Sequence, residues 1–232
     1  MNSYYKQVEK TIMQFDIGKL IIASILYSEQ LSNIPVLTFY KSLERLVTRG
    51  ELLRVGKGLY SRPKKTRFGN IGSSEKDIIN YYTNNKKGVI VGYRLFNSMG
   101  LTTQVPKKTK IYSTQTKENQ KKIGNVSISR LNIKLGKATI EQIEALEILE
   151  NYQIIEDINH RSFVSYTKKI ARQYNEQAFK KVILNINYKK RTIAFLQMIL
   201  NHYNVPNTLS KYLSATSNYK IPNEGVFYEI AR

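Results

Sequence analysis

The stretch "SLERLVTRGELLRVGKGLYSRPKK", residues 42–65, decides the fold of the first part of the chain. It completes a helical pattern and then passes through the glycine-containing turn GKG at 56–58, between two short segments rich in β-forming residues. Glycine supplies the positive φ that a tight hairpin turn needs. Leu53 and Val55 alternate with Arg54, which is the pattern of a half-buried strand. The stretch therefore predicts a helix end followed by a two-stranded hairpin, both rich in basic side chains.

Helices and a short strand are expected before this hairpin. Apolar residues recur at helical spacing along residues 3–15, which predicts a first helix. Residues 19–30 favour a short strand that runs into a second helix. Pro35 suits the start of a third helix, where its missing N–H costs nothing, and Gly50 suits the end of that helix. This order of elements predicts a winged helix-turn-helix, in which the third helix enters the major groove and the hairpin follows the phosphates or the minor groove.

The composition shows a large excess of positive charge. The 232 residues include 37 Lys and Arg against 17 Asp and Glu, a formal net charge of +20. An excess of this size is typical of a protein that binds a polyanion, either nucleic acid or an acidic membrane surface. A codon bias toward Lys, Asn, Ile and Tyr accounts for part of the excess, but such a bias would spread the charge evenly along the chain.

The predicted DNA-contacting residues lie on the third helix and around the hairpin. Phosphate contacts position a protein and base contacts give specificity, so we assign sequence preference to the helix alone. Lys41 and Arg45 beside Glu44 would also suit a solvated helix face, and winged helices also serve as protein-binding modules. The predicted set is Thr38, Lys41, Ser42, Arg45, Arg49, Arg54, Lys57, Tyr60, Arg62, Lys64 and Lys65, extended by Arg67.

A domain boundary is indicated by residues 63–77, which are rich in Pro, Gly, Ser and charge. We expect the winged helix-turn-helix over residues 1–67, a linker over 68–74, and a second domain over 75–232. The fold class is α+β, with the second domain a mixed α/β domain that has a small sheet and several helices.

The second domain has its own sequence of patterns. Ser74 is expected to cap a helix over 75–84, GVIVGYRL indicates a strand entering a helix, and KIYST and VSISRLNI indicate strands. Thr139 and Gln142 have the spacing of a capping box at the start of a further helix. Glu141, Glu144, Glu147 and Glu150 form an acidic row on that helix, which suits a solvated face or a docking surface. Helices with basic outer faces are expected over 163–174 and 176–203, and a loosely ordered tail after Asn204.

The sequence predicts a binding protein without catalytic residues, metal or cofactor. The absence of cysteine excludes disulfides and thiolate metal sites and is natural in the cytoplasm. His160 and His202 have no metal-ligand spacing, and GVIVG at 88–92 lacks the Lys-Ser/Thr of a phosphate-binding loop. The N-terminus has no apolar signal-peptide region, and no apolar run approaches the roughly 18 residues of a membrane span. We expect a cytoplasmic protein with no membrane partner.

The segments "SLERLVTRGELLRVGKGLYSRP" and "GYRLFNSMGLTTQVP", with the strands KIYST and VSISRLNI, resemble AbiEi-type antitoxins of abortive-infection, type IV toxin–antitoxin systems. The likeness runs from about Phe15 to Tyr203. It implies that the first domain binds inverted repeats in double-stranded DNA at the promoter of its own operon and represses it. It also implies that the second domain counteracts a nucleotidyltransferase toxin without needing a stable complex. Residues that match basic positions of the family are Lys41, Arg45, Arg54, Lys57 and Arg62.

The resemblance supplies no catalytic residue. For the antitoxin activity we nominate a basic surface made of Lys107, Lys108, Lys121, Lys122, Lys189, Lys190 and Arg191. Inverted repeats fit either a weak dimer or one monomer bound at each half-site. The alternative functions are a stand-alone winged-helix transcriptional regulator or phage-defence DNA-binding protein without an antitoxin role, and a nucleic-acid enzyme whose site the sequence does not reveal.

Overall fold

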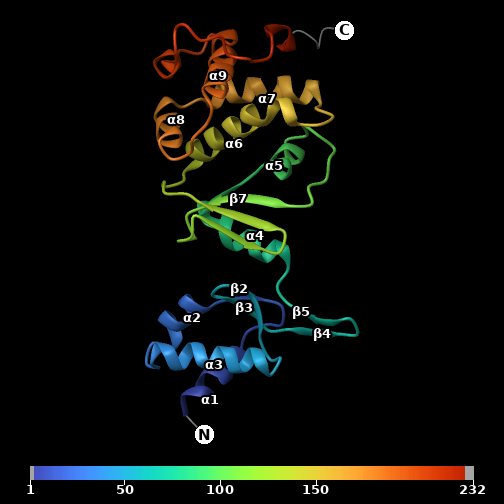
Figure 1. The fold of residues 1–232 in the computed structure, drawn as a ribbon, viewed down its shortest axis with the longest axis vertical. Coiled ribbons are helices and arrows are strands. Elements are labelled where there is room, and N and C mark those ends of the chain that lie inside the picture. The colour runs from blue at the N-terminus through green and yellow to red at the C-terminus, as the bar shows by residue number, and fades with distance from the viewer. Residues whose placement is uncertain (1–2, 228–232) are drawn as a thin grey trace. The chain divides into compact units, whose positions relative to one another are not determined.

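A computed structural model describes residues 3–227 of the chain, and it is mixed α+β with small sheets (Figure 1). The chain divides between Tyr81 and Tyr82, inside helix α4 (Glu75–Thr83), into two units that have separate apolar cores. The expected α+β class is confirmed. Residues 68–74, expected to form a linker, instead contain strand β5 (Gly69–Ile71), and the division lies further along the chain.

The first unit contains the helices, strand and hairpin that the sequence predicted, and one further hairpin. Strands β1, β3 and β2 form an antiparallel sheet in that order, and β4 pairs with β5. The elements are α1 (Ser3–Met13), β1 (Leu20–Ile22), α2 (Ala23–Gln30), α3 (Val36–Thr48), β2 (Leu53–Gly56), β3 (Leu59–Ser61), β4 (Lys64–Thr66) and β5.

Helix α3 is amphipathic, and its apolar side forms the centre of the first core. Phe39, Leu43 and Leu46 recur at helical spacing and are at most 1% exposed, and they pack in one cluster with Val8 and Ile12 of α1. Burying side chains of this size contributes roughly 1.5–3 kcal/mol each. The opposite side of α3 therefore has to face solvent.

The C-terminal end of α3 follows the prediction. Gly50 has φ +70°, in the left-handed region, and its N–H donates to the carbonyl oxygen of Val47 at 2.9 Å. A residue with a side chain would be strained at this φ. The glycine lets the chain turn from α3 into the β2–β3 hairpin within a few residues.

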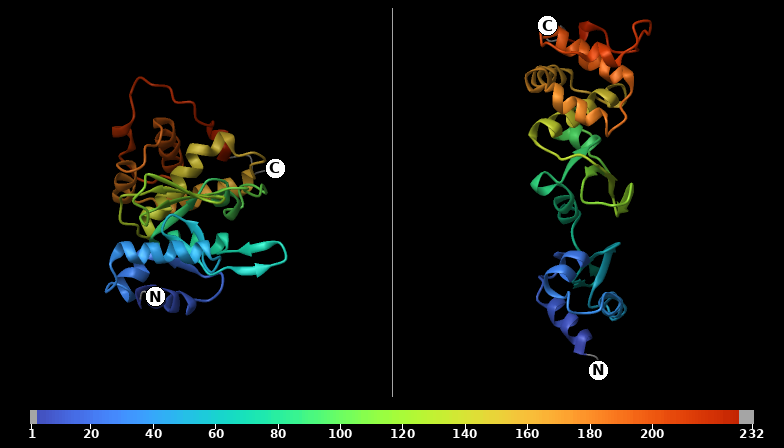
Figure 2. Two further views of the ribbon diagram at one scale, coloured as in Figure 1. Left: turned by 60° about the horizontal axis from the view of Figure 1, so that its bottom comes forward. Right: turned by 90° about the vertical axis from the view of Figure 1, so that its left-hand side faces the viewer.

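The second unit is built around a four-stranded sheet with the order β6-β7-β9-β8. Strands β7 and β9 run parallel, and the other neighbours are antiparallel. The helices α6 to α9 lie in a layer on one side of this sheet (Figures 1 and 2). The elements are β6 (Gly88–Val91), α5 (Tyr93–Ser98), β7 (Thr109–Ser113), β8 (Gln120–Ile123), β9 (Val126–Arg130), α6 (Lys137–Asn151), α7 (His160–Gln173), α8 (Glu176–Ile183) and α9 (Lys190–His202).

Most elements of this unit agree with the sequence patterns, and Ser74 caps α4 as expected by accepting from the Asp77 N–H. Strand β8 was not predicted, since QKKI has no apolar alternation. The expected capping box is wrong, because α6 begins two residues before Thr139. Thr139 Oγ1 instead accepts from the N–H of Gly136, the residue that precedes the helix, at 2.7 Å.

The acidic row on α6 is not a solvated face. Glu147 is only 7% exposed, and its Oε1 accepts from the hydroxyls of Tyr112 at 2.9 Å and Tyr188 at 3.2 Å. Glu150 accepts from Thr192 and forms an ion pair with Lys189 at 3.1 Å. Both carboxylates hold α6 against neighbouring elements, which corrects the expectation of a solvated or docking surface.

Residues 205–227 of the tail pack on the second core, which corrects the expectation of loose order for this part, and residues 228–232 lie outside the described residues. Leu209 is fully buried, and the ring of Phe227 stacks on His202 with centroids 4.3 Å apart. Glu176, at the start of α8, accepts from both the hydroxyl and the N–H of Thr208. One carboxylate therefore fastens the tail to the helices. Within residues 3–227, no helix is both long and apolar enough to cross a membrane.

Glu176→Gln is expected to lower the midpoint of thermal unfolding at about pH 5.5 and to change it less at about pH 3. The hydrogen bond from Thr208 is the main cause that lowers the pKa of Glu176 to about 2 from 4.5. A carboxylate whose pKa is lower in the folded state stabilises the fold above its unfolded pKa, and this stabilisation is lost as the pH falls toward the folded pKa.

The matched control is Glu29→Gln, at an exposed position on α2. Thermal unfolding of both variants and of the wild-type chain at the two pH values checks the prediction. Equal losses for Glu176→Gln at both pH values would contradict the role given to this carboxylate.

Candidate nucleic-acid interface

The exposed side of α3 carries two of the predicted contact residues, one helical turn apart. Lys41 and Arg45 are both exposed. Within residues 3–227, neither side chain forms an ion pair with a carboxylate. Leu37, 74% exposed, and Tyr40, 38% exposed, lie on the same side of the helix toward its N-terminus. The helix thus presents two exposed cations and the exposed Glu44 beside apolar surface.

Tyr60 of the β2–β3 hairpin belongs to the same core cluster as Phe39 and Leu43 of α3. Arg54 of β2 is paired with Tyr60 of β3 in the sheet register. Burial is the main cause that raises the pKa of Tyr60. The positive charge of Arg54 opposes this shift, whereas Tyr40 and Glu44 of α3 add to it. Tyr60 is therefore within electrostatic range of both elements. Arg54 and Lys57, which lies in the turn of the hairpin, are both exposed and add further positive charge to the surface of the first unit.

Two predicted contact residues are buried and are removed from the set. Ser42 is 3% exposed, and its Oγ donates to the carbonyl oxygen of Thr38 at 2.8 Å, within the helix. Tyr60 is 5% exposed and belongs to the first core. Neither side chain can reach a nucleic acid, and Thr38 itself is only half-exposed.

Two predicted contact arginines bind the protein itself. Arg49 donates to the Tyr5 hydroxyl at 2.7 Å and pairs with Glu9 at 3.3 Å and Glu51 at 3.0 Å, which joins the end of α3 to α1. Arg62 donates to the backbone carbonyl oxygens of Met13, the last residue of α1, and of Phe15, which follows the helix. These residues position the helix and the hairpin, and no local pattern indicated this because Tyr5, Glu9 and the carbonyl groups that Arg62 binds are tens of residues away.

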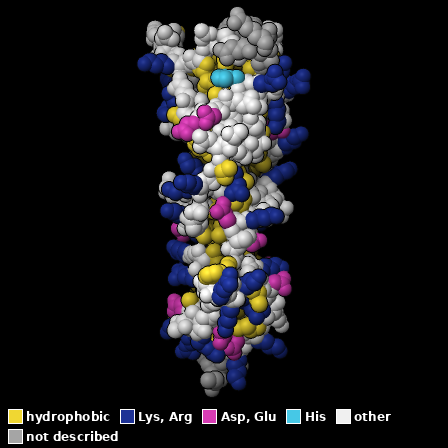
Figure 3. Space-filling view, turned by 90° about the vertical axis from the view of Figure 1, so that its right-hand side faces the viewer, with side chains coloured by type: hydrophobic (Ala, Val, Ile, Leu, Met, Phe, Trp, Pro, Cys, Tyr) yellow, Lys and Arg dark blue, Asp and Glu magenta, His cyan; other side chains and the backbone are white. Residues whose placement is uncertain are grey.

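The remaining exposed cations form what we call the interface set: Lys41, Arg45, Arg54, Lys57, Lys64 and Lys65. Lys64 and Lys65 lie on β4, which continues from the β2–β3 hairpin through Arg62 and Pro63. Figure 3 shows one face of the molecule, on which Lys and Arg side chains are prominent and Asp and Glu are sparser. The charge excess is thus displayed on the surface and is only partly used in internal ion pairs.

The nominated antitoxin residues lie around two adjoining pockets and at the start of α9 in the second unit. Lys121 and Lys122 of β8 line a groove of about 620 Å³ on the sheet, together with Lys110. Lys107 and Lys108 line another pocket, of about 450 Å³, near the start of β7. At the start of α9, Lys189 pairs with Glu150, Arg191 donates to Gln153 Oε1 at 3.3 Å, and Lys190 is exposed. The two pockets share Lys110 and Asn151, and Glu150, the ion-pair partner of Lys189, lines the first of them, so these residues lie on adjoining surfaces.

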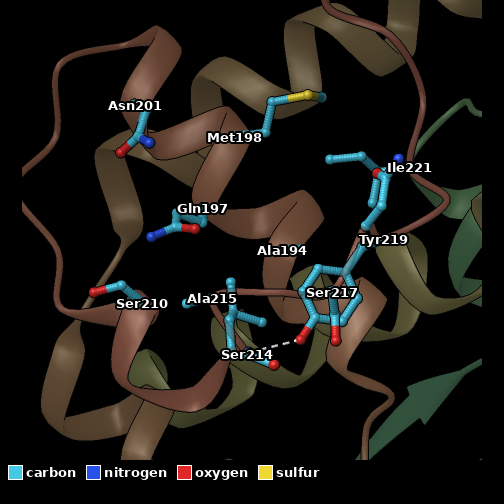
Figure 4. A pocket seen from close by; sticks show the side chains of 12 residues that line it. Ala194, Gln197, Met198, Asn201, Ser210, Ser214, Ala215, Ser217, Tyr219 and Ile221 are labelled. Carbon is cyan, nitrogen blue, oxygen red and sulfur yellow. Dashed lines mark hydrogen bonds between the residues drawn. The ribbon is translucent and has the colours of Figure 1, made fainter.

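A pocket of about 600 Å³ lies between α9 and the tail, and sequence reasoning did not find it (Figure 4). Gln197, Asn201, Ser214 and Tyr219 contribute polar groups, and Tyr219 accepts a hydrogen bond from the Ser214 N–H at 2.8 Å. None of the described residues that line it is charged. Across residues 3–227, no group of three or more His, Asp or Glu side chains is arranged to hold a metal ion.

Comparison with known proteins gives a family but no activity. Residues 7–173 match DUF6088, a family of unknown function, and the match covers more than half of the chain. The chain therefore belongs to this family. No curated protein matches it. The assignment of a ligand consequently rests on the chemistry of the interface set.

Proposed function

For this member of the DUF6088 family, we propose double-stranded DNA as the ligand of the first unit, with α3 in the major groove and the β2–β3 hairpin along the adjacent phosphates. The order of its helices and strands, together with the sheet order β1-β3-β2, supports a winged helix-turn-helix. The observation that carries the proposal is the pair Lys41 and Arg45 on α3, which are exposed and form no ion pair with a carboxylate among residues 3–227, together with the exposed Arg54 and Lys57 of the β2–β3 hairpin.

Each side chain of the interface set has a role that follows from its chemistry. Arg45 has the planar fork that binds guanine O6 and N7 in the major groove, so it specifies sequence. Lys41 serves base edges or phosphates, and the exposed Leu37 is suited to the methyl group of thymine. The remaining cations of the hairpins bind phosphates and fix the register of the protein on the duplex.

The biological role that we propose is a DNA-binding antitoxin that represses its own operon and counteracts a nucleotidyltransferase toxin. The support is the resemblance of the sequence to AbiEi-type antitoxins, and the same DNA-binding unit would serve the repression. In this proposal the protein is cytoplasmic, is not an enzyme, needs no cofactor, and binds inverted repeats as a monomer at each half-site or as a weak dimer. The alternative is a stand-alone winged-helix regulator or phage-defence protein, for which the interface set would be equally suited.

Binding to DNA that contains the promoter of its own operon is expected to depend steeply on salt. Proteins that make about 6–10 phosphate contacts lose roughly 10³–10⁵ in affinity between about 50 and 200 mM salt, because bound cations are released from the DNA. Fluorescence anisotropy with labelled duplex over this range measures the slope. A nearly flat titration would contradict the assignment of the interface set to phosphates.

Arg45→Ala is expected to reduce the preference for promoter DNA over scrambled DNA by about 1–3 kcal/mol, because the bidentate contact to guanine is lost. Arg45→Lys keeps the charge but not the fork, so it should lose most of the same preference. Lys57→Ala should weaken binding to both duplexes about equally and lower the salt slope by about one. Competition binding with the two duplexes measures each effect.

The control for these variants is Lys181→Ala, which removes an exposed lysine on α8. It is expected to bind both duplexes like the wild-type chain. If Arg45→Ala and Lys57→Ala also retained wild-type affinity and preference, the winged-helix roles of α3 and the β2–β3 hairpin would be wrong.

Co-expression with the gene immediately downstream separates the antitoxin from the stand-alone regulator. If the neighbour encodes a nucleotidyltransferase toxin, growth should stop when it is expressed alone and recover when this protein is added. A double variant, Lys41→Ala with Arg45→Ala, should lose repression of a promoter reporter and still restore growth, because the proposed antitoxin activity belongs to the second unit. If the full-length protein failed to relieve growth arrest, the antitoxin role would be wrong and the role of a stand-alone regulator would remain.

A further inference from the structure

The hairpin of β4 and β5, residues 64–71, has features that DNA binding by α3 does not use. We call this hairpin the arm. Figures 1 and 2 show it extending away from α3 and from the three-stranded sheet. Phe68, in the turn at its tip, is 86% exposed, and Ile71 is 56% exposed. The exposed cations Lys64, Lys65 and Arg67 surround them. Because the ring of Phe68 contributes nothing to a core, we infer that it contacts another molecule.

The tip of the arm is fixed by the arm itself. Thr66 Oγ1 donates to the carbonyl oxygen of Gly69 at 2.7 Å and accepts from the N–H of Phe68 at 3.3 Å. Gly69 has φ +112°, which a residue with a side chain rarely adopts. The guanidinium of Arg67 lies over the Phe68 ring, 4.7 Å from its centroid. Phe68 and Arg67 are therefore presented together by a turn that is already in one conformation.

The base of the arm is held to the sheet by buried contacts. Ser61, the last residue of β3, is fully buried, and its Oγ accepts from the N–H of Ser73 at 3.1 Å. At Gly72 a Cβ atom would lie 2.8 Å from the same Oγ, so any side chain there would push the two segments apart. Both ends of the arm thus return to one point on the sheet, which fixes the direction in which the arm leaves it.

The arm begins beside the C-terminal end of α3. Asn70 of β5 lies near Gly50, whose ideal Cβ position is 4.0 Å from the Asn70 Nδ2. One turn of B-DNA measures about 34–36 Å, so the minor groove flanks the major groove at roughly half that distance. A rigid hairpin that leaves the end of a helix bound in the major groove is suited to crossing the phosphate backbone into the neighbouring minor groove.

We propose that the arm is a second DNA-binding element, which enters the minor groove and wedges Phe68 against a base step. This inference rests on the proposed binding of duplex DNA by α3. Minor-groove proteins combine Arg or Lys with an inserted apolar side chain such as Phe, which partly unstacks the bases and kinks the duplex by about 20–90°. Arg67 enters the groove with Phe68, and Lys64 and Lys65 bind the phosphates on either side. The preferred target is a pyrimidine–purine step, which kinks at low cost.

The charge around Phe68 favours DNA over a protein partner. The centres of protein–protein interfaces are depleted in Lys, whereas Lys64, Lys65 and Arg67 all lie within a few residues of this ring. An anionic membrane would also attract these cations, but the arm is continuous with the interface set, which faces solvent on α3 and the β2–β3 hairpin. Sedimentation with vesicles of anionic lipid tests membrane binding separately.

The test compares the full-length wild-type chain with Phe68→Ala and Phe68→Leu on promoter duplex labelled at both ends for energy transfer. The wild-type chain should bend the duplex. Phe68→Ala should abolish the bend and weaken binding by about 5- to 150-fold, the range expected when stacking on one base is lost. Phe68→Leu should keep most of the bend, because leucine also serves as a wedge. A minor-groove-binding dye added to the duplex should reduce the wild-type bend to the Phe68→Ala value.

Two controls separate the arm from α3 and from a loss of folding. Val105→Ala removes an apolar side chain that is 85% exposed in the second unit, and it should leave affinity and bend unchanged. Arg45→Ala should lose sequence preference and keep the bend. Thermal unfolding of Phe68→Ala should match the wild-type curve, since substitutions at exposed sites usually change stability by less than about 0.5 kcal/mol.

The outcomes distinguish this inference from the proposed function. If Phe68→Ala binds and bends like the wild-type chain, the wedge is wrong and DNA binding by α3 stands. If the wild-type chain binds no duplex at any salt concentration, both proposals fail. If Phe68 is needed for sedimentation with vesicles of anionic lipid but not for DNA bending, the arm is a membrane element and the wedge is likewise wrong.

Discussion

In the first unit, the arrangement of the hairpins on the helices depends on one arginine, Arg62. Arg62 Nη1 donates to the carbonyl oxygens of Met13, at 2.8 Å, and Phe15, at 2.7 Å, where the end of α1 leaves carbonyls without helical partners. A charged donor to such groups contributes about 1.5–3 kcal/mol. Arg62 also lies between β3 and β4, so the same side chain fixes the point from which both hairpins leave the helical core.

The cationic side chains of the first unit fall into two groups, one that binds the protein itself and one that faces solvent, and the sequence alone does not distinguish them. Arg49 and Arg62 donate hydrogen bonds to α1 and stabilise the fold. Lys41 and Arg45 instead face solvent and have no carboxylate partner among residues 3–227. An exposed ion pair contributes little to stability, so the unpaired cations cost the fold little and remain available to a polyanion. The division between structural and available cations is what supports DNA as the ligand.

Three carboxylates of the second unit, those of Glu147, Glu150 and Glu176, bind neighbouring elements of the same unit. Burial raises the pKa of Glu147, against the opposing effect of its hydrogen bonds from Tyr112 and Tyr188. A buried carboxyl that keeps hydrogen-bond partners joins α6 to β7 and to the segment before α9. Glu150 and Glu176 act in the same way on the start of α9 and on the tail.

Local patterns in the sequence determined the order of elements in the first unit, the end of α3 at Gly50 and most strands of the second unit. These features depend on the spacing of apolar residues and on the backbone freedom of glycine, which neighbouring residues set. Only the tertiary structure shows that Ser42 and Tyr60 are buried, that Glu147 is internal, and that Gly69–Ile71, within the expected linker 68–74, form a strand of the arm. Which side chains are buried, and which groups they bind, depends on contacts between residues tens of positions apart, so local patterns in the sequence cannot predict them.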